Sequence, residues 1–325
     1  MASNSVKTTL KKEKIAIVGS GLIGRSWAML FAGAGYNVVL YDIKDEQVTS
    51  ALSDIKIQLE AVKKSGMLRG TLSVNEQFNL ISGSNDLEKT ITGAKHIQEC
   101  VPENLDLKKS VFKNLDKYAD ESAVISSSTS CLAPSLFTEE LPKREQCIVC
   151  HPVNPPYYVP LMEVIPSRWT QKNVVERTKE LMTEIGQVPV LIKKELPGFA
   201  LNRIQYAIIG ECWRLVQDGV MSAEDVDKVM TAGLGPRYAF LGPFEVMHLN
   251  AEGMQNYIDR YASSMKSVSA DFGPVPTFDG AALNEIVKDM NSQIPLDKLE
   301  ERHQWRDARL LGLAKLKKDM DVEQK

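Results

Sequence analysis

A glycine-rich loop near the start of the chain has the spacing of a phosphate-binding turn. Gly19, Gly21 and Gly24 form a Gly-x-Gly-x-x-Gly pattern directly after a short apolar run. The first glycine permits a tight turn, the second lets a pyrophosphate approach the backbone, and the third allows close packing of the following helix. The amides of Leu22 and Ile23 fall at the start of that helix, where partial positive charge favours phosphate. The loop therefore predicts a dinucleotide site.

An acidic residue lies where such a site needs one. Asp42 directly follows a second apolar run at 37–41, about twenty residues beyond the glycines, where a carboxylate can accept both hydroxyls of a ribose. Its charge would repel a 2′-phosphate, and no arginine directly follows it, so NAD is expected rather than NADP. Taken alone, Asp42 is equally typical of a turn at a strand end, and the glycine loop is what favours the cofactor interpretation.

A histidine and a glutamate could together act as a general base. A dinucleotide-binding domain supplies a hydride acceptor but no such base. His151 ends the apolar segment 147–150, and Glu163 lies in the apolar segment 161–165 beyond a proline-rich turn. If these segments pair as a hairpin, Glu163 lies beside His151 as the carboxylate that orients a general base. A histidine at a strand end is more often structural and a strand glutamate more often solvated, so the residues alone leave both interpretations open.

The elements that must position these residues alternate between strand and helix. Strand-like runs at 15–18, 37–41, 94–101 and 123–126 are separated by stretches with helical periodicity. Alternation of this kind predicts an α/β domain with a parallel sheet covered on both faces, in the doubly wound arrangement of the Rossmann type.

The pattern of apolar residues changes at Pro197-Gly198. Beyond it, apolar residues recur every three or four positions without intervening strand runs, which predicts a smaller, all-helical C-terminal domain. We therefore expect a flexible leader at 1–13, an NAD-binding Rossmann domain at 14–197 and a helical domain for substrate binding and dimerisation at 198–325.

Composition excludes several classes of partner and site. The 325 residues carry a formal charge of -3, which gives no basic excess for nucleic acid or for an anionic membrane. The polar start has no apolar core of a signal peptide, and the five cysteines are odd in number and widely spread, so we expect a reducing, cytoplasmic location. Cys147, Cys150 and His151 match the spacing of a c-type haem site, but they lie in a strand-like run, and we expect neither haem nor zinc.

Several motifs together make the chain similar to the 3-hydroxyacyl-CoA dehydrogenase family. The resemblance runs in order from about residue 14 to beyond 245. It is carried by the glycine loop, Asp42, Ser127-Ser128-Thr129-Ser130-Cys131-Leu132, His151-Pro152-Val153-Asn154-Pro155, Met162-Glu163-Val164-Ile165, Pro197-Gly198-Phe199-Ala200-Leu201-Asn202-Arg203 and Gly242-Pro243-Phe244-Glu245.

The resemblance implies an NAD-dependent oxidation of a secondary alcohol and assigns roles to six residues. His151 and Glu163 become the pair that carries proton transfer. Ser130 and Asn202 become the residues that hold the reacting oxygen, a task that suits a hydroxyl and a carboxamide. Glu103 and Lys108 become contacts on the nicotinamide side of the cofactor. From the residues alone, Ser130 could instead cap a helix and Asn202 could be an ordinary first-turn helix residue.

A departure from the family's pattern indicates the substrate. The acyl-CoA enzymes usually carry two aromatic residues after the histidine, whereas this chain has Pro152-Val153 and then Tyr157-Tyr158. With the segment 233–238 and a tail containing Gln304-Trp305-Arg306, this looks like the lambda-crystallin branch of the family. That resemblance implies oxidation of L-gulonate at carbon 3. The alternative substrate is a 3-hydroxyacyl-CoA or another short 3-hydroxy acid.

Three further expectations stay open at this stage. Arg237 is a candidate cation for the acid group of the substrate, although it could equally serve a subunit interface. The family resemblance implies a homodimer. The branch also admits a function of another class, in which the protein accumulates in the lens as a structural crystallin that binds NADH without turnover.

Overall fold

The computed structural model describes residues 7–323, which divide into two compact units. The first unit comprises the described chain up to Arg203 together with Asp307 onward, and the second comprises Ile204–Arg306. The domain boundary predicted after residue 197 precedes helix α8 (Leu201–Gln217), whereas this division falls in the helix's first turn. The domain limits therefore stay a prediction.

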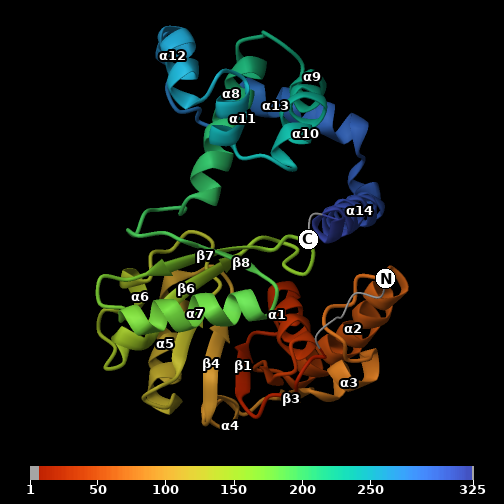
Figure 1. The fold of residues 1–325 in the computed structure, drawn as a ribbon, viewed down its shortest axis with the longest axis vertical. Helices are drawn as coiled ribbons and strands as arrows, with labels where there is room; N and C mark the ends of the chain where they lie inside the picture. The colour runs from red at the N-terminus through yellow and green to blue at the C-terminus, as the bar shows by residue number, and fades with distance from the viewer. Residues whose placement is uncertain (1–6, 324–325) are drawn as a thin grey trace. The chain divides into compact units, whose positions relative to one another are not determined.

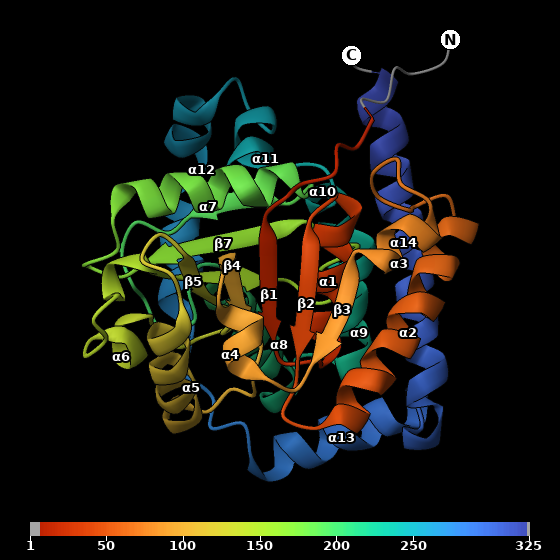
Figure 2. The same cartoon turned by 90° about the horizontal axis from the view of Figure 1, so that it is seen from below.

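An eight-stranded sheet forms the centre of the first unit, with strand order β3-β2-β1-β4-β5-β6-β7-β8. The strands β1 to β6 are parallel, whereas β7 and β8 run antiparallel to them because β6 and β7 pair antiparallel. Figure 2 shows β3, β2 and β1 next to one another. The strands are β1 (Lys14–Val18), β2 (Asn37–Tyr41), β3 (Ile81–Ser84), β4 (Ala94–Glu99), β5 (Val124–Ser127), β6 (Cys147–Pro152), β7 (Leu161–Pro166) and β8 (Val188–Leu191).

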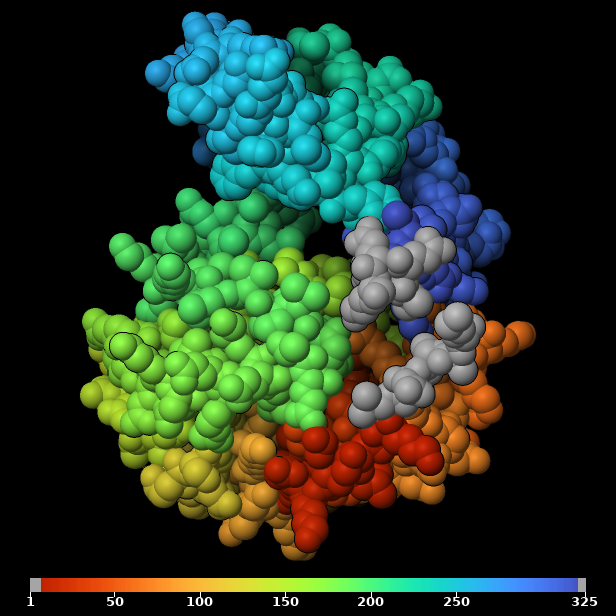
Figure 3. Space-filling model, viewed as in Figure 1, coloured from red at the N-terminus to blue at the C-terminus, as the bar shows by residue number. Residues whose placement is uncertain are grey.

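Helices cover both faces of this sheet, as the alternating pattern predicts, so the Rossmann-type fold is confirmed. One apolar layer joins the strands to α1 (Leu22–Gly33), α2 (Asp45–Lys64) and α7 (Lys172–Glu184), which Figures 1 and 3 show in light green. The other layer joins them to α5 (Leu105–Tyr118) and α6 (Ser135–Thr138). Shorter helices are α3 (Val74–Asn79) and α4 (Leu87–Ile91).

The described part of the second unit is entirely helical, as predicted. Ser222 caps α9 by accepting a hydrogen bond from the amide of Asp225 at 3.1 Å. The helices are the end of α8, α9 (Ala223–Lys228), a π-helical turn (Val229–Leu234), α10 (Gly235–Tyr238), α11 (Pro243–Leu249), α12 (Met254–Asp271), α13 (Gly280–Gln293) and the start of α14 (Leu299–Glu323). No helix within 7–323 is both long and apolar enough to cross a membrane.

The predicted leader at 1–13 lies partly outside the described residues. Where it is described, Thr8 and Thr71 exchange hydrogen bonds of 2.7 and 2.9 Å between each backbone amide and the other's hydroxyl. The amide of Lys11 donates to the carbonyl of Gly35 at 2.8 Å. These contacts tie residues 8–11 to the first unit. They join polar groups, so no apolar periodicity in the sequence indicates them.

Candidate active site

The glycine loop joins β1 to α1, and two of its glycines are required by close backbone contacts. A Cβ on Gly19, whose φ is +111°, would lie 2.8 Å from the carbonyl oxygen of Cys100. A Cβ on Gly24 would lie 1.9 Å from the carbonyl oxygen of Gly19. A Cβ on Gly21 would meet nothing within 4 Å, so the protein itself leaves the space beside the second glycine open. This is the cradle that a pyrophosphate requires.

Asp42 follows β2 beside this loop. Its Oδ2 accepts hydrogen bonds from the amide and the hydroxyl of Ser20, at 2.9 and 2.6 Å. Its Oδ1 accepts one from the amide of Ile43 at 2.8 Å. These bonds hold the carboxylate at the rim of a cavity of about 870 Å³, lined by the glycine loop, Asp42, Ile43 and Val101 among others. The loop, the carboxylate and the cavity fit the adenosine and pyrophosphate of NAD.

His151 and Glu163 face each other across the pairing of β6 and β7, so the predicted hairpin is confirmed. They are direct partners in the register, and His151 Nδ1 lies 2.7 Å from Glu163 Oε2. Both side chains are buried. Because a carboxylate only accepts hydrogen bonds, we assign the proton of the neutral ring to Nδ1, which leaves Nε2 able to accept a proton.

The second oxygen of Glu163 binds the start of α8. Its Oε1 accepts hydrogen bonds from the amides of Ala200 and Leu201, each at 2.9 Å. Burial alone would raise the pKa of Glu163, but the bonds from His151 and from these two amides outweigh it and hold the pKa below its usual range. Glu163 is therefore an ionised carboxylate that fixes both the imidazole and the first turn of α8.

Phe199 sets the bend before that helix. It has a φ of +52°, a left-handed conformation that strains a residue with a side chain, and it is fully buried. Its ring centroid lies 5.7 Å from that of His151. The bend thus aims two helix-terminal amides at Glu163 while the phenyl ring covers the imidazole.

The turn also brings together the two residues expected to hold the reacting oxygen. Asn202 Nδ2 donates a hydrogen bond to the carbonyl oxygen of Ser130 at 2.8 Å. This contact uses one of the two amide protons of Asn202 and leaves the second for another acceptor. The roles of Ser130 and Asn202 in catalysis stay a prediction.

Glu103 binds the loop that contains Ser130. Its Oε1 accepts hydrogen bonds from the hydroxyl of Thr129 and from the amides of Ser130 and Cys131, the last two at 3.3 Å each. Burial alone would raise the pKa of Glu103, but these donors and the nearby Lys108 outweigh it and lower the pKa.

Lys108 is buried beside two carboxylates. Its side chain is 1% exposed, and Nζ lies 3.0 and 3.1 Å from the two oxygens of Glu99. Nζ also lies 3.6 Å from Glu103 Oε2. The structure thus places the ammonium of Lys108 between Glu99 and Glu103, and its contact with the cofactor stays a prediction.

Glu99 was not among the predicted site residues, although its position at a strand end is a signal for it. Glu99 ends β4, a strand in which only Lys95 is exposed, and it is fully buried itself. Carboxyl ends of parallel strands meet at one sheet edge, where ligands of such folds bind. A strand-end carboxylate there is a candidate for the site on the same grounds as Asp42.

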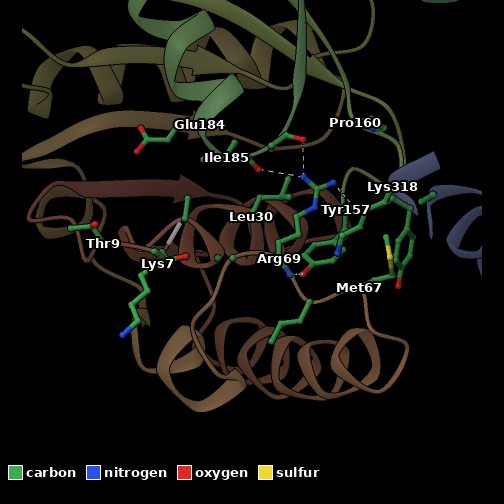
Figure 4. A pocket seen from close by; sticks show the side chains of 18 of the residues that line it. Lys7, Thr9, Leu30, Met67, Arg69, Tyr157, Pro160, Glu184, Ile185 and Lys318 are labelled. Atoms are coloured by element: carbon green, nitrogen blue, oxygen red, sulfur yellow. Dashed lines mark hydrogen bonds between the residues drawn. The ribbon is translucent and has the colours of Figure 1, made fainter. Parts of the chain in front are cut away.

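A second missed residue supports the loop between β6 and β7. The guanidinium of Arg69 donates to the carbonyl oxygens of Tyr157 at 2.8 Å, Gly186 at 2.9 Å and Ile185 at 3.3 Å (Figure 4). The amide of Arg69 donates to the hydroxyl oxygen of Tyr157 at 3.0 Å. Burial lowers the pKa of Arg69. These bonds bridge the loop that follows His151 to the end of α7, beside a cavity of about 880 Å³.

The haem-like cysteine spacing, the metal prediction and Arg237 concern residues outside this hydrogen-bonded network. Cys147 and Cys150 pack in the apolar layers on opposite faces of the sheet, which a haem bound to both would disrupt. Within 7–323, no cluster of three or more His, Cys, Asp and Glu side chains could hold a metal ion. Arg237 lies in α10 of the second unit, and its contact with a substrate carboxylate stays a prediction.

Comparison with known proteins identifies relatives along almost the whole chain. The chain is 52% identical over 311 residues to the human (Homo sapiens) lambda-crystallin homolog, covering 95% of this chain and 98% of the relative. It is 31% identical over 318 residues to an L-carnitine dehydrogenase of Bacillus cereus, covering 97% and 94% of the two chains. The structure superposes with a TM-score of 0.80 on an NAD⁺-dependent 5-formyl-3-hydroxy-2-methylpyridine 4-carboxylic acid 5-dehydrogenase at 25% identity, covering 95% and 98%.

Family models match both parts of the chain. The NAD-binding domain of 3-hydroxyacyl-CoA dehydrogenase matches residues 14–196, and the C-terminal domain of the same enzymes matches residues 198–284. These spans follow the predicted order of a nucleotide-binding domain and a helical domain. The chain therefore belongs to the 3-hydroxyacyl-CoA dehydrogenase family of NAD-dependent oxidoreductases, among which the lambda-crystallins are its relatives at about half identity.

Proposed function

We propose that the protein oxidises L-gulonate to 3-dehydro-L-gulonate, with NAD⁺ as the hydride acceptor and His151 as the general base. The observation that carries the chemistry is the buried contact of 2.7 Å between His151 Nδ1 and Glu163 Oε2. It lies in one hydrogen-bonded network with Asn202 and Ser130 through the first turn of α8. A base, its orienting carboxylate and two polar groups for an oxygen are the parts that alcohol oxidation requires.

Each residue has a separate task in the proposed reaction. When bound, NAD⁺ accepts the hydride that leaves carbon 3 of the alcohol. His151 Nε2 accepts the proton of the hydroxyl, and the imidazolium that results is stabilised by Glu163. The hydroxyl of Ser130 and the second amide proton of Asn202 donate to the same oxygen and hold it near His151. Phe199 covers the imidazole and limits the access of water to it.

The substrate assignment is supported by the sequence beside the base. Pro152-Val153 replaces the aromatic pair of the acyl-CoA enzymes, and relatives that share about half of this chain's residues are lambda-crystallins. A relative named for L-carnitine indicates that the family extends to small free hydroxy acids. Arg237 is our candidate partner for the substrate carboxylate.

Initial rates of NADH formation at neutral pH test the substrate directly. L-gulonate, a short-chain 3-hydroxyacyl-CoA and free 3-hydroxybutyrate are compared at matched concentrations. We expect the highest kcat/KM with L-gulonate. A preference for the CoA ester would leave the assignment as a dehydrogenase intact but would refute L-gulonate as the substrate.

A structural function remains the second candidate, because the related rabbit (Oryctolagus cuniculus) protein is named lambda-crystallin. A protein with that function alone would bind NADH in a titration but give no turnover with any of the three substrates. Retention of His151, Glu163 and Asp42 favours catalysis, since storage in the lens requires none of them.

We further propose a cytoplasmic homodimer. The second unit exposes large apolar side chains, among them Phe244, Leu249 and Val275, and a second copy of the chain would cover such surface. All five cysteines are free thiols, which suits a reducing compartment. Sedimentation at micromolar concentration should give twice the monomer mass, and imaging of a tagged chain in cells should show cytoplasmic signal. A monomer, or signal confined to an organelle, would contradict the respective proposal.

A further inference from the structure

Three charged side chains at the carboxyl edge of the sheet form a cluster in which Glu99 and Lys108 are buried and Glu103 is exposed. Glu99 ends β4, Glu103 lies in the loop that follows, and Lys108 lies in α5. The ammonium of Lys108 lies within 3.0 to 3.6 Å of oxygens from both carboxylates. Glu99 and Lys108 are almost completely shielded from water, so charge there acts with little screening.

The hydrogen bonds around Glu99 all point toward its carboxyl oxygens, as suits the ionised form. Ser127 Oγ accepts a bond from the amide of Thr129 at 3.2 Å and donates its own proton to Glu99 Oε2 at 2.5 Å. The amide of Val101 donates to Glu99 Oε1 at 2.5 Å, and Lys108 donates to both oxygens. The pKa of Glu99 is raised, chiefly by burial, and these donors limit the rise without cancelling it. Each carboxyl oxygen of Glu99 accepts two hydrogen bonds, a pattern that fits a carboxylate, and two carboxylates with one ammonium give the cluster a net charge of about -1.

A short chain of contacts joins this cluster to the proposed base. Glu103 accepts the amide of Ser130, and the carbonyl of Ser130 accepts from Asn202. Asn202 follows Leu201, whose amide binds Glu163, the partner of His151. A hydride passes between carbons that are roughly 3.5 Å apart, so a nicotinamide ring beside an alcohol bound to His151 must lie against the same loop as Glu103.

We propose that the cluster of Glu99, Glu103 and Lys108 sets the preference of the site for oxidised over reduced cofactor. The inference rests on the proposed function, because that places the nicotinamide at this loop. The ring carries a positive charge in NAD⁺ and none in NADH. A nearby negative charge therefore stabilises only the oxidised form, whereas contacts to the rest of the cofactor act on both forms equally.

Variants of opposite charge test this assignment through the ratio of two dissociation constants. Glu99→Gln removes a negative charge, and Lys108→Met removes a positive one. A unit charge about 10 Å away at an effective dielectric constant of ~20 changes the relative affinity about tenfold or more. We expect the ratio Kd(NADH)/Kd(NAD⁺), measured by calorimetric titration without substrate, to fall about tenfold in Glu99→Gln and to rise about tenfold in Lys108→Met. Tenfold corresponds to about 30 mV in the potential of the bound couple.

Opposite shifts separate an electrostatic role from structural damage, which would weaken both cofactors alike. Asp116→Asn is the matched control, because it removes a buried carboxylate from α5 eight residues after Lys108, roughly 12 Å along the helix. Its ratio should change less than threefold. If the buried variants do not fold, Glu103→Gln tests the proposal instead, because its amide oxygen can still accept hydrogen bonds from Thr129, Ser130 and Cys131. We expect the ratio Kd(NADH)/Kd(NAD⁺) to fall in this variant.

Failure of this proposal and failure of the proposed function give different results. Unchanged ratios, or shifts of the same sign in Glu99→Gln and Lys108→Met, would overturn the role of the cluster while leaving the dehydrogenase intact. A wild-type protein that binds neither form of the cofactor would refute the proposed function itself.

Discussion

Replacement of Glu163 by glutamine should abolish the base without disturbing the fold around it. The glutamine oxygen can still accept the amides of Ala200 and Leu201, which the carboxylate binds at 2.9 Å each. Its NH₂ group must then face His151 Nδ1 and donate to it. The neutral imidazole would carry its proton on Nε2, so the atom that should accept the proton of the alcohol is blocked.

The size of the effect follows from the charge that is lost. Unit charges about 4 Å apart at an effective dielectric constant of ~20 attract by about 4 kcal/mol, so the imidazolium would lose about that much stabilisation. At 1.36 kcal/mol for each factor of ten, kcat should fall roughly 10³-fold. The free energy of unfolding should change by less than about 1 kcal/mol, since the bonds to the first turn of α8 are retained.

Steady-state kinetics with L-gulonate, together with urea denaturation, measures both quantities. Glu163→Ala is the comparison variant, because it also removes the acceptor for the two amides and should lower the free energy of unfolding by about 2 kcal/mol. A kcat of Glu163→Gln within tenfold of the wild type would refute the assignment of the tautomer and of the base.

Three other variants test separate parts of the site. Asp42→Ala should raise the Kd of NAD⁺ at least tenfold and narrow the preference for NAD⁺ over NADP⁺, because it removes the ribose acceptor and its charge. Calorimetric titration with both cofactors measures the two dissociation constants, and unchanged constants would exclude the ribose contact. Arg237→Met should raise KM for L-gulonate about tenfold or more with the Kd of NADH unchanged, because a charge-assisted bond to the carboxylate is lost, and an unaltered KM would leave Arg237 without a substrate role. Arg69→Met should lower the free energy of unfolding by about 2–3 kcal/mol in a urea titration, since three carbonyl groups lose their donor, and a loss below about 0.5 kcal/mol would contradict the bridging role.

The central part of the fold was predictable because its signals are local. The β-branched run at 15–18, the glycine loop and Asp42 lie in one contiguous stretch, and their spacing alone specifies strand, turn and helix. The antiparallel turn to β7 was also accessible, because a proline-rich segment between two apolar runs indicates a hairpin. The two strands that were not predicted, β3 and β8, are four residues long and contain glycine or proline, which are depleted in strands.

The site was predictable in its residue types but not in its connections. His151 and Glu163 followed from pairing of adjacent strands, whereas Ser130, Asn202, Glu103 and Lys108 entered only through resemblance to a family. No local pattern shows that Lys108 would be buried against Glu99, since that contact depends on how β4 and α5 pack. Nor does a pattern show that one oxygen of Glu163 would bind α8, because the bend at Phe199 is set by tertiary contacts.

The most direct measurement is kcat for L-gulonate oxidation by His151→Gln, made beside a titration of the same variant with NADH. If His151 accepts the proton of the alcohol, kcat falls 10²- to 10⁴-fold while the Kd of NADH stays within about twofold of the wild type. A variant that oxidises L-gulonate at nearly the wild-type rate would contradict the assignment of the base, and with it the catalytic role of the pair formed with Glu163.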